Sequence, residues 1–225
     1  MIKINEHTWR IEDGIVRFFV LEGETKALMI DTGMTTVDAS RIASSLTTKP
    51  LELLNTHADR DHIAGNGAFE WCYMNPAEEE NYRSAGGAGK IHPIHDGDVI
   101  DLGGRPLEII LIPGHTPGSV AILDVNARVL ISGDSVQDDK IFMFGKFRSL
   151  SDYIPSMRKL LQFEKRFDTV YPSHGTFPVA PSIIPKLIEG AESITTSKAT
   201  GKQTELFGNP VMLYQFPYAG FFCGM

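Results

Sequence analysis

The sequence predicts an α/β (α+β) chain in which helices cover buried sheets. Two observations carry this prediction: short runs rich in β-branched and aromatic residues recur along the 225 residues, and amphipathic helical patterns lie between them. Hydrophobic residues make up 42% of the chain, which is enough to build a sizeable core. We therefore expect an ordered globular chain and exclude a mainly disordered one.

Seven apolar runs bounded by turn residues are predicted to be strands. They are Ile15–Leu21, Ala27–Ile30, Leu51–Leu54, Leu107–Ile112, Val120–Leu123, Val129–Ile131 and Val211–Phe216. We expect the last of these runs to be the final strand. A further short apolar run, Val170–Pro172, has the same character and ends in a turn.

Three segments have the apolar spacing of helices. The first is Thr36–Leu46; the second starts near Ser151, where Ser151-Asp152 is a candidate cap and Pro155 fits an early turn; the third runs from about Pro181 to Ser193. The glycine-rich stretch Ser84–Gly89 lacks the spacing of a nucleotide-binding loop and is predicted to be a surface loop. No internal repeat is evident, which excludes a solenoid, and the length allows either one large or two small domains.

Charge and composition exclude several classes of partner. The chain has 21 Lys and Arg against 28 Asp and Glu, a net charge of −7, so we expect no nucleic-acid partner. Apolar runs such as Ile109–Ile112 are too short to cross a bilayer, and the amino terminus lacks the apolar segment of a secretory signal. We therefore expect a cytoplasmic protein with no membrane partner. The two cysteines, Cys72 and Cys223, are too few for a disulfide framework.

Four strand-like runs are each followed by a turn that carries histidine or aspartate. These turns contain His57, Asp59, Asp61 and His62 after the first run, His115 after the second, Asp134 after the third and His174 after the fourth. Taken singly, each residue would more often form a turn or cap a helix. Together they offer imidazole and carboxylate groups at successive strand ends, which predicts a metal site. His7, His92 and His95 lack such turns and are not predicted to bind metal.

This ordered set resembles the metallo-β-lactamase superfamily of hydrolases, whose pattern is HxHxDH followed by a lone His, a lone Asp and a lone His. The resemblance covers essentially the whole chain, so it implies one domain over residues 1–225. It also implies a four-layer αββα sandwich with a dinuclear metal site at one edge. Carried across position by position, it implies one metal on His57 and His115, and a second on Asp61, His62 and His174. Asp134 would bridge both metals.

Asp59 departs from that pattern, because the chain reads HxDxDH where the family usually has histidine. Flavodiiron proteins, which are relatives in this superfamily, also place a carboxylate here and use it as an iron ligand. An additional oxygen ligand favours harder ions, so we expect iron or manganese to be preferred over zinc. The extra negative charge should also acidify a metal-bound water less than an all-histidine site does.

The resemblance implies a metal-dependent hydrolase with two divalent ions (zinc, iron or manganese) that uses a metal-bound hydroxide, with Asp61 as the catalytic residue that orients it. The expected substrate is a small-molecule ester, thioester, lactone or phosphoester. Two alternatives stay open: a di-iron oxidoreductase with a separate electron donor, and a catalytically silent binding protein. The apolar segment Ile141–Phe147 is predicted to be a loop that forms either a lid over the substrate or an interface with another chain.

Overall fold

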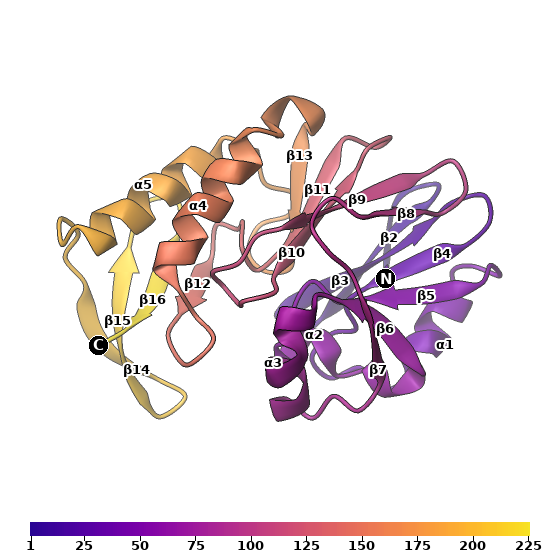
Figure 1. The fold of residues 1–225 in the computed structure, drawn as a ribbon, viewed down its shortest axis with the longest axis horizontal. Coiled ribbons are helices and arrows are strands. Elements are labelled where there is room, and N and C mark those ends of the chain that lie inside the picture. Colours follow the sequence, from indigo (N-terminus) through magenta and orange to yellow (C-terminus); the bar gives the residue numbers. More distant parts are fainter.

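Two sheets packed face to face form the centre of the molecule, and helices cover the outer face of each (Figure 1). The structure is a computed structural model and describes all residues, 1–225. This arrangement is the predicted four-layer αββα sandwich, so the fold class is confirmed. No helix is both long and apolar enough to span a bilayer.

The first sheet has seven strands in chain order. They are β1 (Ile2–Asn5), β2 (Thr8–Asp13), β3 (Val16–Glu22), β4 (Ala27–Ile30), β5 (Leu51–Leu54), β6 (Trp71–Met74) and β7 (Lys90–Pro93). The first four strands form an antiparallel meander, whereas β4 to β7 are parallel. Parallel neighbours need crossover connections, and these contain α1 (Ala39–Ser44), α2 (Arg60–Ile63) and α3 (Glu79–Ser84), with 3-10 turns at Asn66–Ala68 and Pro76–Glu78.

The second sheet has five strands in the order β13-β11-β10-β9-β8. Their bounds are β8 (Val99–Asp101), β9 (Pro106–Leu111), β10 (Val120–Asp124), β11 (Val129–Gly133) and β13 (Thr169–Pro172). Strands β9 and β11 are both antiparallel to β10, and β13 is parallel to β11. The carboxyl ends of β9, β11 and β13 therefore lie at the same edge of this sheet.

Alternate side chains of one strand pack into two different cores, because both sheets are covered on both faces. In β3, Phe19 and Leu21 pack between the two sheets, whereas Phe18 and Val20 face the helices α1 to α3. In β10, Ile122 faces the partner sheet. Successive side chains of a strand point to opposite faces, so a strand covered on both sides reads as a continuous apolar run. This is why these runs were recognisable in the sequence.

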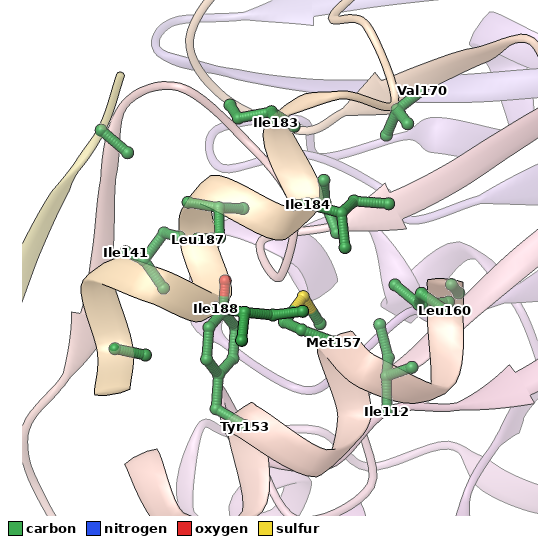
Figure 2. Close-up of a cluster of buried hydrophobic side chains, with 14 of the residues drawn as sticks. Ile112, Ile141, Tyr153, Met157, Leu160, Val170, Ile183, Ile184, Leu187 and Ile188 are labelled. Atoms are coloured by element: carbon green, nitrogen blue, oxygen red, sulfur yellow. The ribbon is translucent and has the colours of Figure 1, made fainter. Parts of the chain in front are cut away.

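Helices α4 (Leu150–Leu161) and α5 (Ile183–Thr195) lie side by side over the outer face of the second sheet (Figure 1). Figure 2 shows their core, in which Tyr153 and Met157 of α4 meet Ile184 and Leu187 of α5. Ile112, which follows β9, packs into the same cluster. A 3-10 turn at Glu164–Arg166 follows α4.

A third, four-stranded sheet packs against these two helices and was not predicted. Its order is β12-β16-β15-β14, with bounds β12 (Lys140–Met143), β14 (Lys202–Leu206), β15 (Asn209–Gln215) and β16 (Gly220–Gly224). The predicted loop Ile141–Phe147 therefore begins as strand β12, which pairs with β16. The run Val211–Phe216 is not the final strand, because β16 follows it. Strand β14, which precedes this run, was not predicted either.

The predicted helices are present with shifted boundaries. Helix α1 is shorter than Thr36–Leu46 and starts after Asp38, whose carboxylate accepts a hydrogen bond from the backbone NH of Arg41 at 3.0 Å. Helix α4 is capped by Ser149 and not by Ser151 or Asp152, because the Ser149 hydroxyl accepts from the backbone NH of Asp152 at 3.2 Å. Both cysteines are buried and free.

Candidate metal centre

Four loops from both sheets meet at one edge of the sandwich. His57 lies between β5 and α2 of the first sheet and Asp61 and His62 lie in α2 itself, whereas His115, Asp134 and His174 follow β9, β11 and β13 of the second sheet. The loops approach closely at Gly133, which has a φ of 53°. A Cβ atom there would lie 2.9 Å from the Thr56 hydroxyl oxygen, so glycine allows the two sheets to bring their loops together.

Asp134 lies at the centre of the four histidines. Its Oδ2 is 3.3 Å from Nε2 of His174, 3.6 Å from Nε2 of His115 and 4.0 Å from Nε2 of His57. Its Oδ1 is 3.2 Å from Nε2 of His62. One carboxylate thus faces every imidazole that the sequence singled out.

The candidate donors form two groups that share Asp134. We call His57, His115 and Asp134 the first donor set, and Asp61, His62, Asp134 and His174 the second donor set. Within each set the candidate ligand atoms lie within 4.8 Å of one another. The structure therefore brings together six of the seven predicted metal-binding residues in the two predicted groups.

Each imidazole is held through its other ring nitrogen. Nδ1 of His57 lies 3.0 Å from the Thr56 hydroxyl, and Nδ1 of His62 lies 2.9 Å from Oδ2 of Asp31. Nδ1 of His115 lies 3.1 Å from the carbonyl oxygen of Phe142, and Nδ1 of His174 lies 2.8 Å from that of Ile15. A carbonyl oxygen accepts a hydrogen bond, so Nδ1 of His115 and of His174 carries the proton. This leaves Nε2 of each ring available to coordinate a metal.

The inner atoms of the cluster lack the partners that buried polar groups normally have. Nε2 of His57, His62 and His115 and Oδ1 of Asp134 are buried without a hydrogen-bond partner. Leaving so many polar atoms unpaired in one place costs stability unless another group completes their coordination. Imidazole nitrogen and carboxylate oxygen are ligands for zinc, iron and manganese, so these residues fit a metal centre.

The charges of the cluster act strongly on one another. Burial lowers the pKa of His174, but the charge and hydrogen bond of Asp134 and the hydrogen bond of Asp61 outweigh it and raise this pKa to about 10. Burial raises the pKa of Asp134, yet the neighbouring His174 and His62 hold it well below its usual range. Without a cation, protons on histidine balance the carboxylates, and a cation would replace them.

Asp59 occupies a different position from the other six residues. Its Oδ2 lies 3.3 Å from Nε2 of His115 and 3.6 Å from Nε2 of His57, next to the first donor set. The same oxygen accepts a hydrogen bond from the guanidinium of Arg148, and Oδ1 accepts one from the Asn81 amide at 3.1 Å. Asp59 stands at the start of α2, but its side chain makes no capping hydrogen bond.

Three residues outside the two donor sets fix the loops. Asp31 accepts a hydrogen bond from the Thr56 backbone NH at 2.8 Å and also orients His62. Glu78 is fully buried and accepts from the backbone NH of Ala58 at 2.9 Å and of Gly118 at 2.7 Å, so it joins the His57 loop to the His115 loop.

The third residue outside the donor sets is Arg17 of β3. It donates to the carbonyl oxygen of His174 at 3.0 Å and thereby ties the first sheet to the last ligand loop. The remaining histidines lie elsewhere: His7 and His95 are exposed, and His92 stacks on Trp71 with ring centroids 4.2 Å apart. Neither Arg17 nor Glu78 stands in a recognisable motif, because the backbone groups that they bind are at least 20 residues away.

Comparison with known families identifies the class of protein. Residues 11–174 match the family model of the metallo-beta-lactamase superfamily, and this range contains all seven predicted site residues. The chain belongs to this superfamily. A metallo-beta-lactamase structure from Pontibacter korlensis has the same fold, with a TM-score of 0.71 over 84% of this chain and 97% of that chain, at 18% identity.

Among individual relatives, the chain is similar to acyl-coenzyme A thioesterase MBLAC2 of Gallus gallus. The two are 27% identical over 69% of this chain and 71% of that protein. It is also 30% identical to the human mitochondrial persulfide dioxygenase ETHE1, over 49% of this chain and 43% of that protein. The superfamily thus includes both hydrolytic and oxidative relatives of this chain.

Proposed function

We propose that this chain is a metal-dependent hydrolase that cleaves a small thioester or a related ester, lactone or phosphoester. The observation that carries the proposal is the convergence of buried, unpartnered imidazole nitrogens on the carboxylate of Asp134. In this proposal one divalent cation binds the first donor set, a second binds the second donor set, and Asp134 is shared. Bound there, the cations would activate a water molecule and polarise the scissile carbonyl or phosphoryl oxygen.

Asp61 is the proposed catalytic residue. Its half-buried carboxylate lines a cavity of about 840 Å³ together with Asp134 and His174. Oδ2 of Asp61 lies 3.3 Å from Nε2 of His174, so the carboxylate is held in place and still reaches solvent in the cavity. It can accept the proton of the attacking water at Oδ2 and hold the water in line with the substrate carbon.

The identity of the metal depends on how Asp59 is used. An oxygen from Asp59 beside the first donor set favours iron or manganese, as the sequence predicted. Arg148 binds the same oxygen and offsets its negative charge. The occupied site would then have the formal charge of a site with histidine at position 59, so the expected difference in the pKa of the activated water disappears. Zinc, iron and manganese all belong in the metal test.

A thioester is the leading substrate because the similarity to an acyl-coenzyme A thioesterase covers more than two thirds of both chains. A thioester carbonyl is an electrophile of the kind that a cation polarises and a water attacks. The chain presents no serine or cysteine nucleophile to the cavity next to the histidines, so the proposed attack is by water. Ser84, the one serine on the cavity wall, lies on α3.

The second candidate function is an iron-dependent oxidation, which the similarity to a persulfide dioxygenase favours. It predicts iron in the purified protein and consumption of oxygen in the presence of a thiol or persulfide. It also predicts no hydrolysis of thioesters at any metal loading. The two candidates therefore differ in the metal that supports activity and in the product.

Metal analysis and a substrate panel test the proposal. Protein purified without added metal is analysed for its metals, stripped, reloaded with zinc, manganese or ferrous iron, and assayed on thioesters, esters, lactones and phosphodiesters. We expect thioester hydrolysis that Asp61→Asn lowers by roughly 10²–10⁴-fold in kcat. Asp168→Asn, an exposed surface change, serves as the matched control. No hydrolysis with any metal, together with oxygen consumption, would establish the oxidative candidate instead.

A further inference from the structure

The cavity beside the metal centre has an aromatic side. Four phenylalanines line it, all carried by the third sheet or the segment after β12: Phe142, Phe144, Phe207 and Phe222. We call these four residues the aromatic wall. The ring centroid of Phe142 lies 5.8 Å from that of Phe144, 6.1 Å from that of Phe207 and 5.6 Å from that of Phe222, so the rings form one continuous apolar surface.

Strand register builds this surface. Strand β12 pairs in parallel with β16, which places Phe142 directly beside Phe222. Phe207 and Gly208 form the two-residue turn between β14 and β15, with φ values of 51° and 75°. A turn of this kind normally carries asparagine, aspartate or glycine, and Phe207 is nevertheless a bulky aromatic that is 77% exposed. Phe207 lines the cavity, so a role in contacting a bound molecule would account for an aromatic side chain in this turn.

The aromatic wall is joined directly to the candidate metal ligands. The carbonyl oxygen of Phe142 accepts the hydrogen bond from Nδ1 of His115, while the ring of Phe142 lines the cavity. Ile15 and Met34 also line this cavity and are 73% and 39% exposed. The cavity that contains Asp61 and Asp134 therefore offers apolar surface beyond the four phenylalanines.

Half of the aromatic wall lies outside the part of the chain that matches the superfamily. The family match ends at residue 174, whereas Phe207 and Phe222 belong to β14–β16. The ligand loops and β12 thus lie within the matched range, whereas β14, β15 and β16 lie beyond it. Side chains at the mouth of a site that a superfamily shares are positioned to select the substrate.

We propose that the aromatic wall binds the apolar acyl chain of the substrate and places its carbonyl beside Asp61 and Asp134. This inference rests on the proposed hydrolysis and names the part of the substrate that the enzyme selects. The cavity volume is within the range of roughly 300–1,000 Å³ that holds small ligands, which suits an acyl chain and is too small for a folded partner. Lys140 lines the same cavity and can meet an anionic leaving group.

A series of acyl thioesters that share one thiol leaving group and differ in acyl-chain length tests whether the aromatic wall binds the acyl chain. Each methylene buried against it should raise kcat/KM by up to about fourfold until the cavity is filled. Phe207→Ser and Phe222→Ala should reduce the advantage of a twelve-carbon chain over a two-carbon chain by roughly tenfold or more. Val99→Ser, which removes an exposed apolar side chain of β8 away from the cavity, should keep the parental preference.

Binding without turnover separates this inference from the proposed function. The free carboxylates of the same acyl chains are titrated calorimetrically into the parent, Phe207→Ser and Val99→Ser. Affinity that rises with chain length and falls in Phe207→Ser supports the wall even if no thioester is hydrolysed, in which case only the proposed reaction fails. Hydrolysis without chain-length preference, or a preference that both phenylalanine variants retain, would overturn the proposed role of the aromatic wall. The proposed hydrolysis would still be supported. Absence of both binding and hydrolysis would overturn both.

Discussion

Arg148 donates a hydrogen bond to Oδ2 of Asp59, the same carboxylate oxygen that lies 3.3 Å from Nε2 of His115. Both side chains are largely buried, so the pair is shielded from solvent. The guanidinium therefore competes with any cation on the first donor set for this oxygen. The second donor set has no such competitor and contains four candidate ligands against three.

The first prediction concerns this competition. Arg148→Gln should strengthen the weaker of two cation-binding events by roughly 10-fold or more, because a hydrogen bond to a charged group contributes about 1.5–3 kcal/mol. Calorimetric titration with manganese and zinc measures the change. Arg158→Gln, which breaks the surface pair with Glu192, is the matched control. Weaker binding in Arg148→Gln would show instead that Arg148 positions Asp59 for the cation.

The second prediction concerns Asp31, which orients His62 through a 2.9 Å contact with Nδ1. Asp31→Asn should lower metal affinity by about 10–100-fold, because the amide holds the ring less firmly and removes a negative charge behind it. Competition with a chromophoric chelator measures the affinity. Asp38→Asn, which alters the cap of α1 on the surface, should leave it unchanged. Equal affinities in both variants would contradict the orienting role.

The third prediction concerns Glu78, a fully buried carboxylate that accepts backbone hydrogen bonds from both ligand loops. Glu78→Ala should lower the free energy of unfolding by about 2–4 kcal/mol, because it leaves two buried NH groups unpaired. Glu78→Gln should retain part of this stability, since its amide oxygen can still accept one bond. Urea unfolding of metal-free protein measures both. Glu79→Gln, at the exposed neighbouring position, is the control.

The fourth prediction concerns pH and Asp13, which holds the segment Met34–Thr36 at the cavity mouth. Burial raises the pKa of Asp13, but hydrogen bonds from the backbone NH and hydroxyl groups of Thr35 and Thr36 outweigh it and lower this pKa to about 2. The unfolded chain thus binds the proton more readily, and this contribution to stability is present above pH about 4 and lost between about 4 and 2.

Asp13→Asn should remove this part of the acid sensitivity. Urea unfolding of metal-free parent and variant at pH 5, 4 and 3 measures it, and the difference in stability between them should shrink as the pH falls. The exposed change Glu205→Gln should show no such trend. A constant difference across this range would mean that the hydrogen bonds to Asp13 do not depend on its charge.

Local sequence pattern was sufficient to predict buried strands with helices between them and to predict the ligand loops, whereas the four-layer sandwich was predicted from the resemblance to the superfamily. Runs such as Val120–Leu123 are apolar on both faces, and each ligand follows a strand within a few residues. Of the third sheet, only the run Val211–Phe216 was predicted, and β14 (Lys202–Leu206) was missed because it is largely polar and becomes a strand only by pairing with β15. Local pattern does not report such pairing.

The contacts of Asp59 and Glu78 could not be predicted from the sequence for a related reason. Glu78 stands in the acidic stretch Glu78-Glu79-Glu80, where composition indicates an exposed surface, and only the approach of two loops buries it. Arg148 is 89 residues from Asp59, and nothing in either segment indicates their pairing. Sequence spacing thus predicted the candidate metal ligands, but not the groups that compete for them or support them.

The contact between Phe142 and His115 has an evolutionary consequence. The acceptor is a backbone oxygen, which every amino acid possesses, so a change of side chain at position 142 leaves the imidazole tethered. Mutation at that position can reshape the surface presented to incoming molecules at little risk to the reactive centre. Diversification of selectivity and preservation of chemistry are thus separated within a single residue.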